Sequence, residues 1–259
     1  MKLLNDWLGF FKPLQVKNLQ IFWSGQACAL IGMWLQVTAM GILVYSISGG
    51  SATAVGLLAA LNALPFFLGG MLLAGLGDRF DRRKLLIAVQ SVQWLVAAVL
   101  FLLTFLDALQ LWHLYAAGLV MGINQTVGFP TQQAFVGDLI PRKQLQEAVG
   151  MYSLVFNTCR AVGPALAGYI IAEWGAATAF GGNVLASLPL IGCLVSLKGH
   201  ISEAAAPKKQ RGSGRKVSGL KAVLSTRSLL FIMLSALIQN ICGQSLYQLS
   251  LIHISEPTR

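Results

Sequence analysis

The chain has few charged residues: Asp, Glu, Lys and Arg together make up 11% of it, whereas 56% is hydrophobic and the mean hydropathy is +0.68. So little charge at this apolar content excludes an ordinary soluble domain. The alternating segments of about ten residues that build a membrane β-barrel are also missing. The amino-terminal stretch lacks a short apolar core followed by a small-residue cleavage site, so we expect no removed signal peptide. The sequence predicts an all-α, polytopic membrane protein.

Residue types that build catalytic or metal sites are sparse. The four cysteines lie singly in apolar stretches and show no paired spacing for a metal or a redox dithiol: Cys28, Cys159, Cys193 and Cys242. The three histidines form no ligand spacing with an acidic partner: His113, His200 and His253. We therefore expect no metal, no cofactor and no enzymatic activity, with a polytopic membrane enzyme as the least favoured alternative.

Long apolar runs recur along the chain. A helix needs about 20 mostly apolar residues to cross a hydrocarbon core of about 30 Å. Seven segments meet this length and are predicted to lie in the lipid bilayer: 19–47, 53–76, 85–106, 109–129, 148–172, 176–197 and 228–249. Their polar residues are expected to form hydrogen bonds between helices: Gln26, Gln36, Asn62, Asn124, Gln125 and Asn183.

The only long polar interval, residues 198–227, is basic and rich in Gly, Ser, Ala and Pro. Such a composition is typical of a linker. We predict a six-helix bundle over residues 1–197, a cytoplasmic linker over 198–227 and the start of a second bundle over 228–248. An ordinary long loop without domain meaning is the alternative.

The net charge of +10 is explained by where the Lys and Arg residues fall relative to the membrane. When the chain is threaded through the seven spans, every Lys and Arg except Arg160 and Arg259 falls on one side of the membrane. The opposite loops, 48–52, 107–108 and 173–175, contain none. This asymmetry predicts a cytoplasmic amino terminus. Basic loops beside anionic headgroups explain the charge without a nucleic-acid partner.

Two short motifs stand out. The first, "GLGDRFDRRK" at residues 75–84, carries six charged residues between two spans. Its cations fit the topology, but Asp78 and Asp81 do not contribute to it, and they could meet an arginine or the positive end of a neighbouring helix. From the residues alone, a solvated turn and a functional latch are equally open.

The second motif, "NTCRAVGPALAGYI" at residues 157–170, contains Gly163, Pro164 and Gly168. Small residues permit close helix packing, and a proline removes a backbone hydrogen bond and favours a bend. On spacing alone, this pattern also fits a generic kinked helix contact.

Both motifs resemble the major facilitator superfamily. Residues 75–84 are similar to its signature loop between the second and third helices, which reads Gly, two spacers, Asp-Arg, spacer, Gly-Arg-Arg/Lys. The matching residues are Gly75, Asp78, Arg79, Arg82 and Arg83. Asp81 stands where the superfamily usually has Gly, a variant similar to the exporter branch that includes enterobactin and macrolide efflux proteins. Residues 157–170 resemble the fifth-helix motif of the exporter branches.

The resemblance implies two six-helix bundles of inverted three-helix repeats, with a substrate site between them near mid-membrane. It also implies a secondary active transporter of a bacterial inner membrane that works by alternating access and exports siderophore-like or drug-like small molecules. Residues 75–83 would form its cytoplasmic gating loop. A membrane scaffold that transports nothing is the alternative.

Arg160 is the only Lys or Arg inside a predicted span. A cation there costs at least about 2.5 kcal/mol, so it should face an aqueous cavity or a partner. It either lines the substrate cavity, or is neutralised by backbone carbonyls or by Asn157 three residues earlier. Proton coupling is possible for this class, but the acids that could serve it lie at predicted helix ends: Asp78, Asp107, Asp138 and Glu173.

The last eleven residues, "LSLIHISEPTR" at 249–259, resemble the peptide that a common sequencing-library transposon adapter encodes. We expect this segment to be an artefact in which His253, Glu256 and Arg259 have no function. The chain would then be an amino-terminal part of a longer transporter with five further helices. A natural polar tail is the alternative.

Overall fold

The computed structural model describes residues 17–73, 80–139, 145–196 and 231, and in these ranges the protein is helical. Six long helices follow one another: α2 (Lys17–Ile47), α3 (Ala52–Leu73), α5 (Arg82–Phe105), α6 (Leu111–Leu139), α7 (Leu145–Trp174) and α8 (Ala176–Ser196). All six lie in the first of two units, Met1–Ala206. The predicted linker and the adapter-like tail lie outside the described residues, as does the seventh helix apart from Phe231. The all-α fold class is confirmed.

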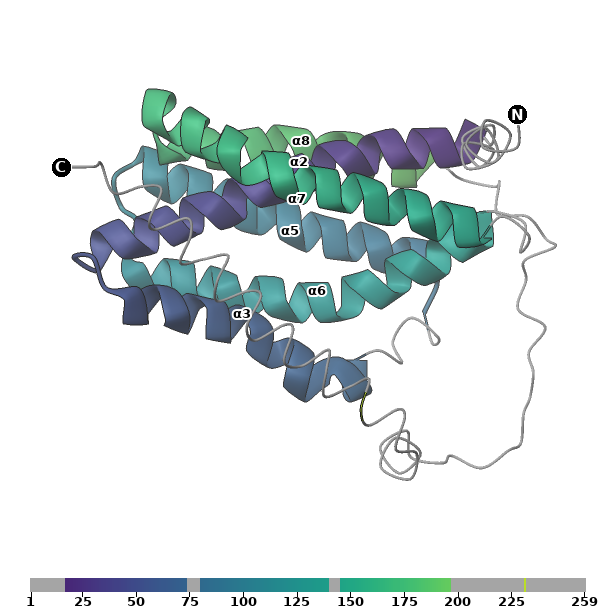
Figure 1. Ribbon diagram of the computed structural model, residues 1–259, viewed down its shortest axis with the longest axis horizontal. Coiled ribbons are helices and arrows are strands. Elements are labelled where there is room, and N and C mark those ends of the chain that lie inside the picture. The colour runs from purple at the N-terminus through teal and green to yellow at the C-terminus, as the bar shows by residue number, and fades with distance from the viewer. Residues whose placement is uncertain (1–16, 74–79, 140–144, 197–230, 232–259) are drawn as a thin grey trace. The chain divides into compact units, whose positions relative to one another are not determined.

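Most helix boundaries agree with the predicted spans, but the fourth does not. The sequence predicted an end at residue 129, whereas α6 continues to Leu139. The apolar run stops at Pro130, yet the helix continues because side chains can satisfy backbone groups near a membrane proline. In the turn that contains Pro130, the Thr131 hydroxyl donates to the Val127 carbonyl at 2.7 Å. Figure 1 shows α6 bending along its length, as a proline in a helix predicts.

Four described helices are long and apolar enough to cross a membrane: Leu19–Ile47, Arg82–Phe105, Gln146–Trp174 and Ala176–Ser196. α3 is also strongly apolar over its 22 residues, which include the apolar stretch Ala52–Phe66. α6 is not among these four, and its middle and second half contain four amide side chains: Asn124, Gln125, Gln132 and Gln133.

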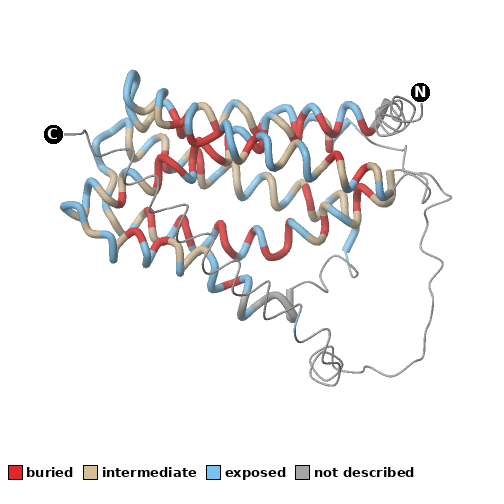
Figure 2. The backbone as a smooth tube through the Cα atoms, viewed as in Figure 1, coloured by how far each residue is buried: buried red, intermediate tan, exposed pale blue. Residues whose placement is uncertain are grey.

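The helices pack with α2 against α8 and α7, α3 against α6, and α5 against both α6 and α8 (Figure 1). Glycines permit these approaches. A Cβ on Gly25 would lie 2.9 Å from the Cα of Leu190, so α2 and α8 are in backbone contact. In the same way Gly122 of α6 faces the Asn62 carbonyl of α3. Figure 2 shows buried residues on the facing sides of the helices and exposed ones outside.

Polar side chains tie the buried faces together. The Asn183 amide of α8 donates to the Gln36 side-chain oxygen of α2, and both side chains are at most 1% exposed. Gln36 in turn donates to the sulfur of Met121 in α6 at 3.1 Å. Asn62 donates to the Gly118 carbonyl at 3.2 Å and Asn124 to the Val89 carbonyl at 2.9 Å. The predicted interhelical roles of Gln36, Asn62, Asn124 and Asn183 are confirmed.

The α2–α8 contact predicts a difference between two glycines of the same helix. Gly25→Ala should lower the free energy of unfolding by about 1–2 kcal/mol because the new methyl group overpacks the Leu190 backbone. Gly41, whose Cβ would have no atom of the described helices within 4 Å, is the matched control. Gly41→Ala should be neutral or stabilising by up to about 1 kcal/mol, through helix propensity. Tryptophan fluorescence during SDS titration of the purified protein measures both, and equal effects would contradict the close approach.

Candidate functional site

Asp81, the residue that departs from the superfamily pattern, is the N-cap of α5. Its side chain accepts the Lys84 backbone N–H at 3.1 Å. An acid at this position satisfies an otherwise free helix N–H group and interacts favourably with the helix dipole. Asp81 therefore defines where the third helix begins, immediately before the two arginines of the motif.

Arg82 joins α5 to the end of α6. One nitrogen, Nη1, donates to both carboxylate oxygens of Asp138, at 2.8 and 2.9 Å. The two side chains are 28% and 21% exposed. Because α6 runs past Pro130, its last turn brings Asp138 to the start of α5. The sequence placed Asp138 only at a helix end, and no local pattern signals a partner 56 residues away.

Arg83 joins the same turn of α5 to the end of α8. Its Nε donates to the Leu194 carbonyl at 2.6 Å and its Nη2 to the Val195 carbonyl at 2.8 Å. The last carbonyls of a helix have no partner within the helix, and a cation near them is favourable. We call Arg82, Arg83, Asp138 and these two carbonyls the arginine brace, which links three helix ends. The other predicted gating residues lie outside the described residues: Gly75, Asp78 and Arg79.

The fifth-helix motif contributes a close contact in α7. A Cβ on Gly163 would lie 2.5 Å from the Cβ of Trp34 in α2, so this position requires glycine. Pro164 is buried beside it, and α7 continues through it to Trp174. Gly168 differs because its Cβ would meet no described atom within 4 Å. Two of the three motif residues thus lie against the described helices, while Gly168 faces open space.

Arg160 and Asn157 have different surroundings. Asn157 is exposed and its amide donates to the Ser153 carbonyl of its own helix at 2.7 Å. Arg160 is half-buried. Asn157 lines a cavity, whereas Arg160 is not among the described residues that line it.

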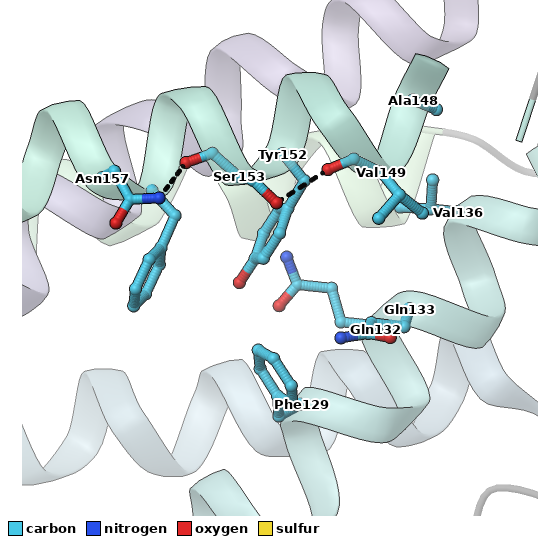
Figure 3. Close-up of a pocket in the computed structure, with 10 residues that line it drawn as sticks. Phe129, Gln132, Gln133, Val136, Ala148, Val149, Tyr152, Ser153 and Asn157 are labelled. Carbon is cyan, nitrogen blue, oxygen red and sulfur yellow. Dashed lines mark hydrogen bonds between the residues drawn. The ribbon is translucent and has the colours of Figure 1, made fainter. Parts of the chain in front are cut away.

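That cavity lies between α6 and α7 and has a volume of about 230 Å³. Figure 3 shows side chains from the two helices facing each other across it. Aromatic rings form part of the wall, with the Tyr152 ring centroid 6.4 Å from that of Phe129 and 5.9 Å from that of Phe156. The lining residues are Phe129, Gln132, Gln133, Val136, Ala148, Val149, Tyr152, Ser153, Phe156 and Asn157. Asn157 is the one residue among them that was predicted from the sequence as a cavity residue. The pair of amides at Gln132 and Gln133, two and three residues after Pro130, was the signal available for the rest.

Apolar helices, glycine-mediated packing and charged helix ends define the class of the chain as a polytopic α-helical membrane protein. The sequence profile of the transmembrane secretion effector family, a branch of the major facilitator superfamily, matches residues 8–253. The chain belongs to this family. It is a multi-pass bacterial membrane protein, and the resemblance noted from the two motifs is confirmed.

Several curated relatives are similar to it. The staphyloferrin A transporter of Staphylococcus aureus is 28% identical over 160 residues, which cover 61% of this chain and 40% of that protein. The macrolide efflux protein A of Streptococcus pyogenes is 25% identical over 67% of the chain and 41% of its own length. The class C tetracycline resistance protein of Escherichia coli is 30% identical over 72% and 47%. The matches thus span less than half the length of these relatives. No solved structure matches significantly.

The arginine brace predicts an energetic coupling between Arg82 and Asp138. In a double-mutant cycle, Arg82→Ala and Asp138→Ala should be less than additive by about 1 kcal/mol, since the pair is partly exposed. Lys84→Ala is the control, because this exposed cation lies in the same turn. Its effect should stay within about 0.5 kcal/mol. Unfolding of each variant in detergent gives the values, and additive effects would mean that the pair contributes no stability.

Proposed function

We propose that the chain is the amino-terminal part of a secondary active transporter that exports small molecules by alternating access. Membership of the secretion effector family supports this most strongly. Relatives named for staphyloferrin A transport, macrolide efflux and tetracycline resistance favour a siderophore-like or drug-like substrate. In this proposal residues 1–197 form the first six-helix bundle, 198–227 a linker and 228–248 the start of the second bundle. Residues 249–259 are an adapter-derived tail, and no enzymatic activity is involved.

The proposed orientation places the amino terminus and the arginine brace at the cytoplasmic side of the bacterial inner membrane. The asymmetric distribution of Lys and Arg supports it. The arginine brace engages Arg82 and Arg83 within one bundle, so this bundle can move as a rigid body. Asp78 and Arg79 of the same loop are then the residues we assign to contact with the other half. Gly163 and Pro164 are assigned to packing within the bundle, and Gly168 to the face that meets a partner helix.

Export itself is tested with the intact transporter gene in everted membrane vesicles. Substrate-dependent accumulation inside the vesicles, driven by a proton gradient, is expected if the protein exports and is coupled to protons. Accumulation that continues after the proton gradient is collapsed would contradict proton coupling but not export. No accumulation of a siderophore, a macrolide or a tetracycline would favour the scaffold alternative.

Asp78→Asn should reduce the initial export rate at least about tenfold, equivalent to about 1.4 kcal/mol, because the amide cannot replace the carboxylate in a charged latch. Membrane insertion, followed by immunoblotting of the membrane fraction, should be unchanged. Asp107→Asn is the matched control. Asp107 lies at the opposite end of α5 with a positive φ of 51°, a conformation that Asn tolerates well. Equal export by wild type and Asp78→Asn would reduce the motif to a topology signal.

For Arg160 we propose a position at the substrate path. In a Cys159→Ser background, Arg160→Cys should react with a water-soluble thiol reagent, and bound substrate should slow the reaction. Removing Cys159 first is necessary because it is adjacent in α7. Asn157→Cys, at an exposed position one turn earlier, is the positive control for labelling. If the cysteine at 160 stays unreactive while that at 157 reacts, Arg160 has a packing role only.

A further inference from the structure

The cavity lies where α6, which contains Pro130, bends toward the first turns of α7 (Figure 1). In this part of α6 the residues on the α7 side are Phe129, Gln132, Gln133 and Val136, and they line the cavity without filling it (Figure 3). At about 230 Å³ it is larger than the cavity of about 150 Å³ that holds one benzene ring in another protein. A group of two fused rings therefore fits, whereas a whole macrolide does not.

The polar side chains that line the cavity differ in whether they have hydrogen-bond partners. The Ser153 hydroxyl donates to the Val149 carbonyl at 3.0 Å, and the Asn157 amide donates to the Ser153 carbonyl at 2.7 Å. The Gln132 amide nitrogen, by contrast, is buried and has no hydrogen-bond partner within the described part of the chain. A buried donor without a partner is costly, so an acceptor atom placed beside it is strongly preferred.

Charge and shape restrict the ligand further. None of the ten described residues that line the cavity is charged. An ionised group entering it would lose water without gaining a counter-charge, which is unfavourable. The Tyr152 and Phe156 rings lie one helical turn apart and stack at an interplanar angle of 25°, and both residues contribute to the aromatic surface of the cavity. Planar aromatic ligands interact well with such a surface.

We propose that this cavity binds an uncharged, planar aromatic group of about two fused rings, which stacks on Tyr152 and Phe156 and accepts a hydrogen bond from the Gln132 amide. Gln132 is then a specificity-determining residue that selects ligands carrying a carbonyl or ether oxygen. The assignment of this ligand class as transported cargo rests on the proposed function, whereas binding to the cavity does not.

Three probes of similar size test the proposal. Methoxycoumarin is aromatic, uncharged and carries a carbonyl oxygen, methylnaphthalene lacks the acceptor, and carboxycoumarin adds a negative charge. Binding to the complete 259-residue chain in lipid nanodiscs is measured by tryptophan quenching, with empty nanodiscs subtracted. Trp23 lies 5.7 Å, between ring centroids, from Tyr152 and so reports on the cavity wall. We expect methoxycoumarin to bind at least about tenfold more tightly than carboxycoumarin.

Gln132→Leu should weaken methoxycoumarin binding about five- to tenfold, the effect of one hydrogen bond. The same variant should leave methylnaphthalene binding unchanged or tighter, because the unsatisfied donor is gone. Gln132→Met provides the same comparison if the leucine variant cannot be purified. Gln20→Leu, at an exposed glutamine of α2 outside the cavity, should alter neither ligand. Phe156→Leu should weaken both aromatic probes.

The proposal would be overturned if Gln132→Leu abolished the binding of both methoxycoumarin and methylnaphthalene, or left both unchanged. Equal binding of methoxycoumarin and carboxycoumarin to the unaltered chain would also overturn it. The vesicle assay separates the two levels of inference. The expected binding pattern without export by the intact transporter would retain the cavity assignment and contradict the transport proposal. Export without this binding pattern would retain the transport proposal and contradict the cavity assignment.

Discussion

The close approach of α2 to α8 is the constraint on which the rest of the bundle depends. Apolar surfaces gain little by associating within lipid, so membrane helices are held by close packing and by hydrogen bonds between them. Gly25 and Gly32 allow the α8 backbone to lie directly on α2, and the buried Gln36–Asn183 hydrogen bond sets their register. A side chain at either glycine would separate the helices and break this bond.

The position of α8 determines what the charged motif can reach. Because α8 is held against α2, its last carbonyls lie beside the first turn of α5, where Arg83 satisfies them. Asp81 starts α5 one residue before the two arginines, so both point from a defined helix end. The motif therefore divides into two parts. Arg82 and Arg83 connect helices of one bundle. Asp78 and Arg79 are the residues that we propose to contact the other half of the transporter.

Pro130 links the arginine brace to the cavity. The bent α6 approaches the first turns of α7, where its residues line the cavity, and its last turn brings Asp138 to Arg82. Residues 129–138 of α6 thus supply Asp138 to the arginine brace and line one side of the cavity.

The sequence by itself determined the all-α class, the order of the six described helices and the family, because apolar length and the two motifs are local properties of the chain. Gly163 could be expected to make a close contact from its residue type alone. Only the tertiary structure decided that Trp34 is its neighbour, that Asp138 pairs with Arg82, and that Arg83 meets the end of α8. The extension of α6 past Pro130 and the cavity beside it were also not predicted. These features depend on residues far apart in the chain, and their pairing follows from how closely the helix backbones approach, which no local pattern encodes.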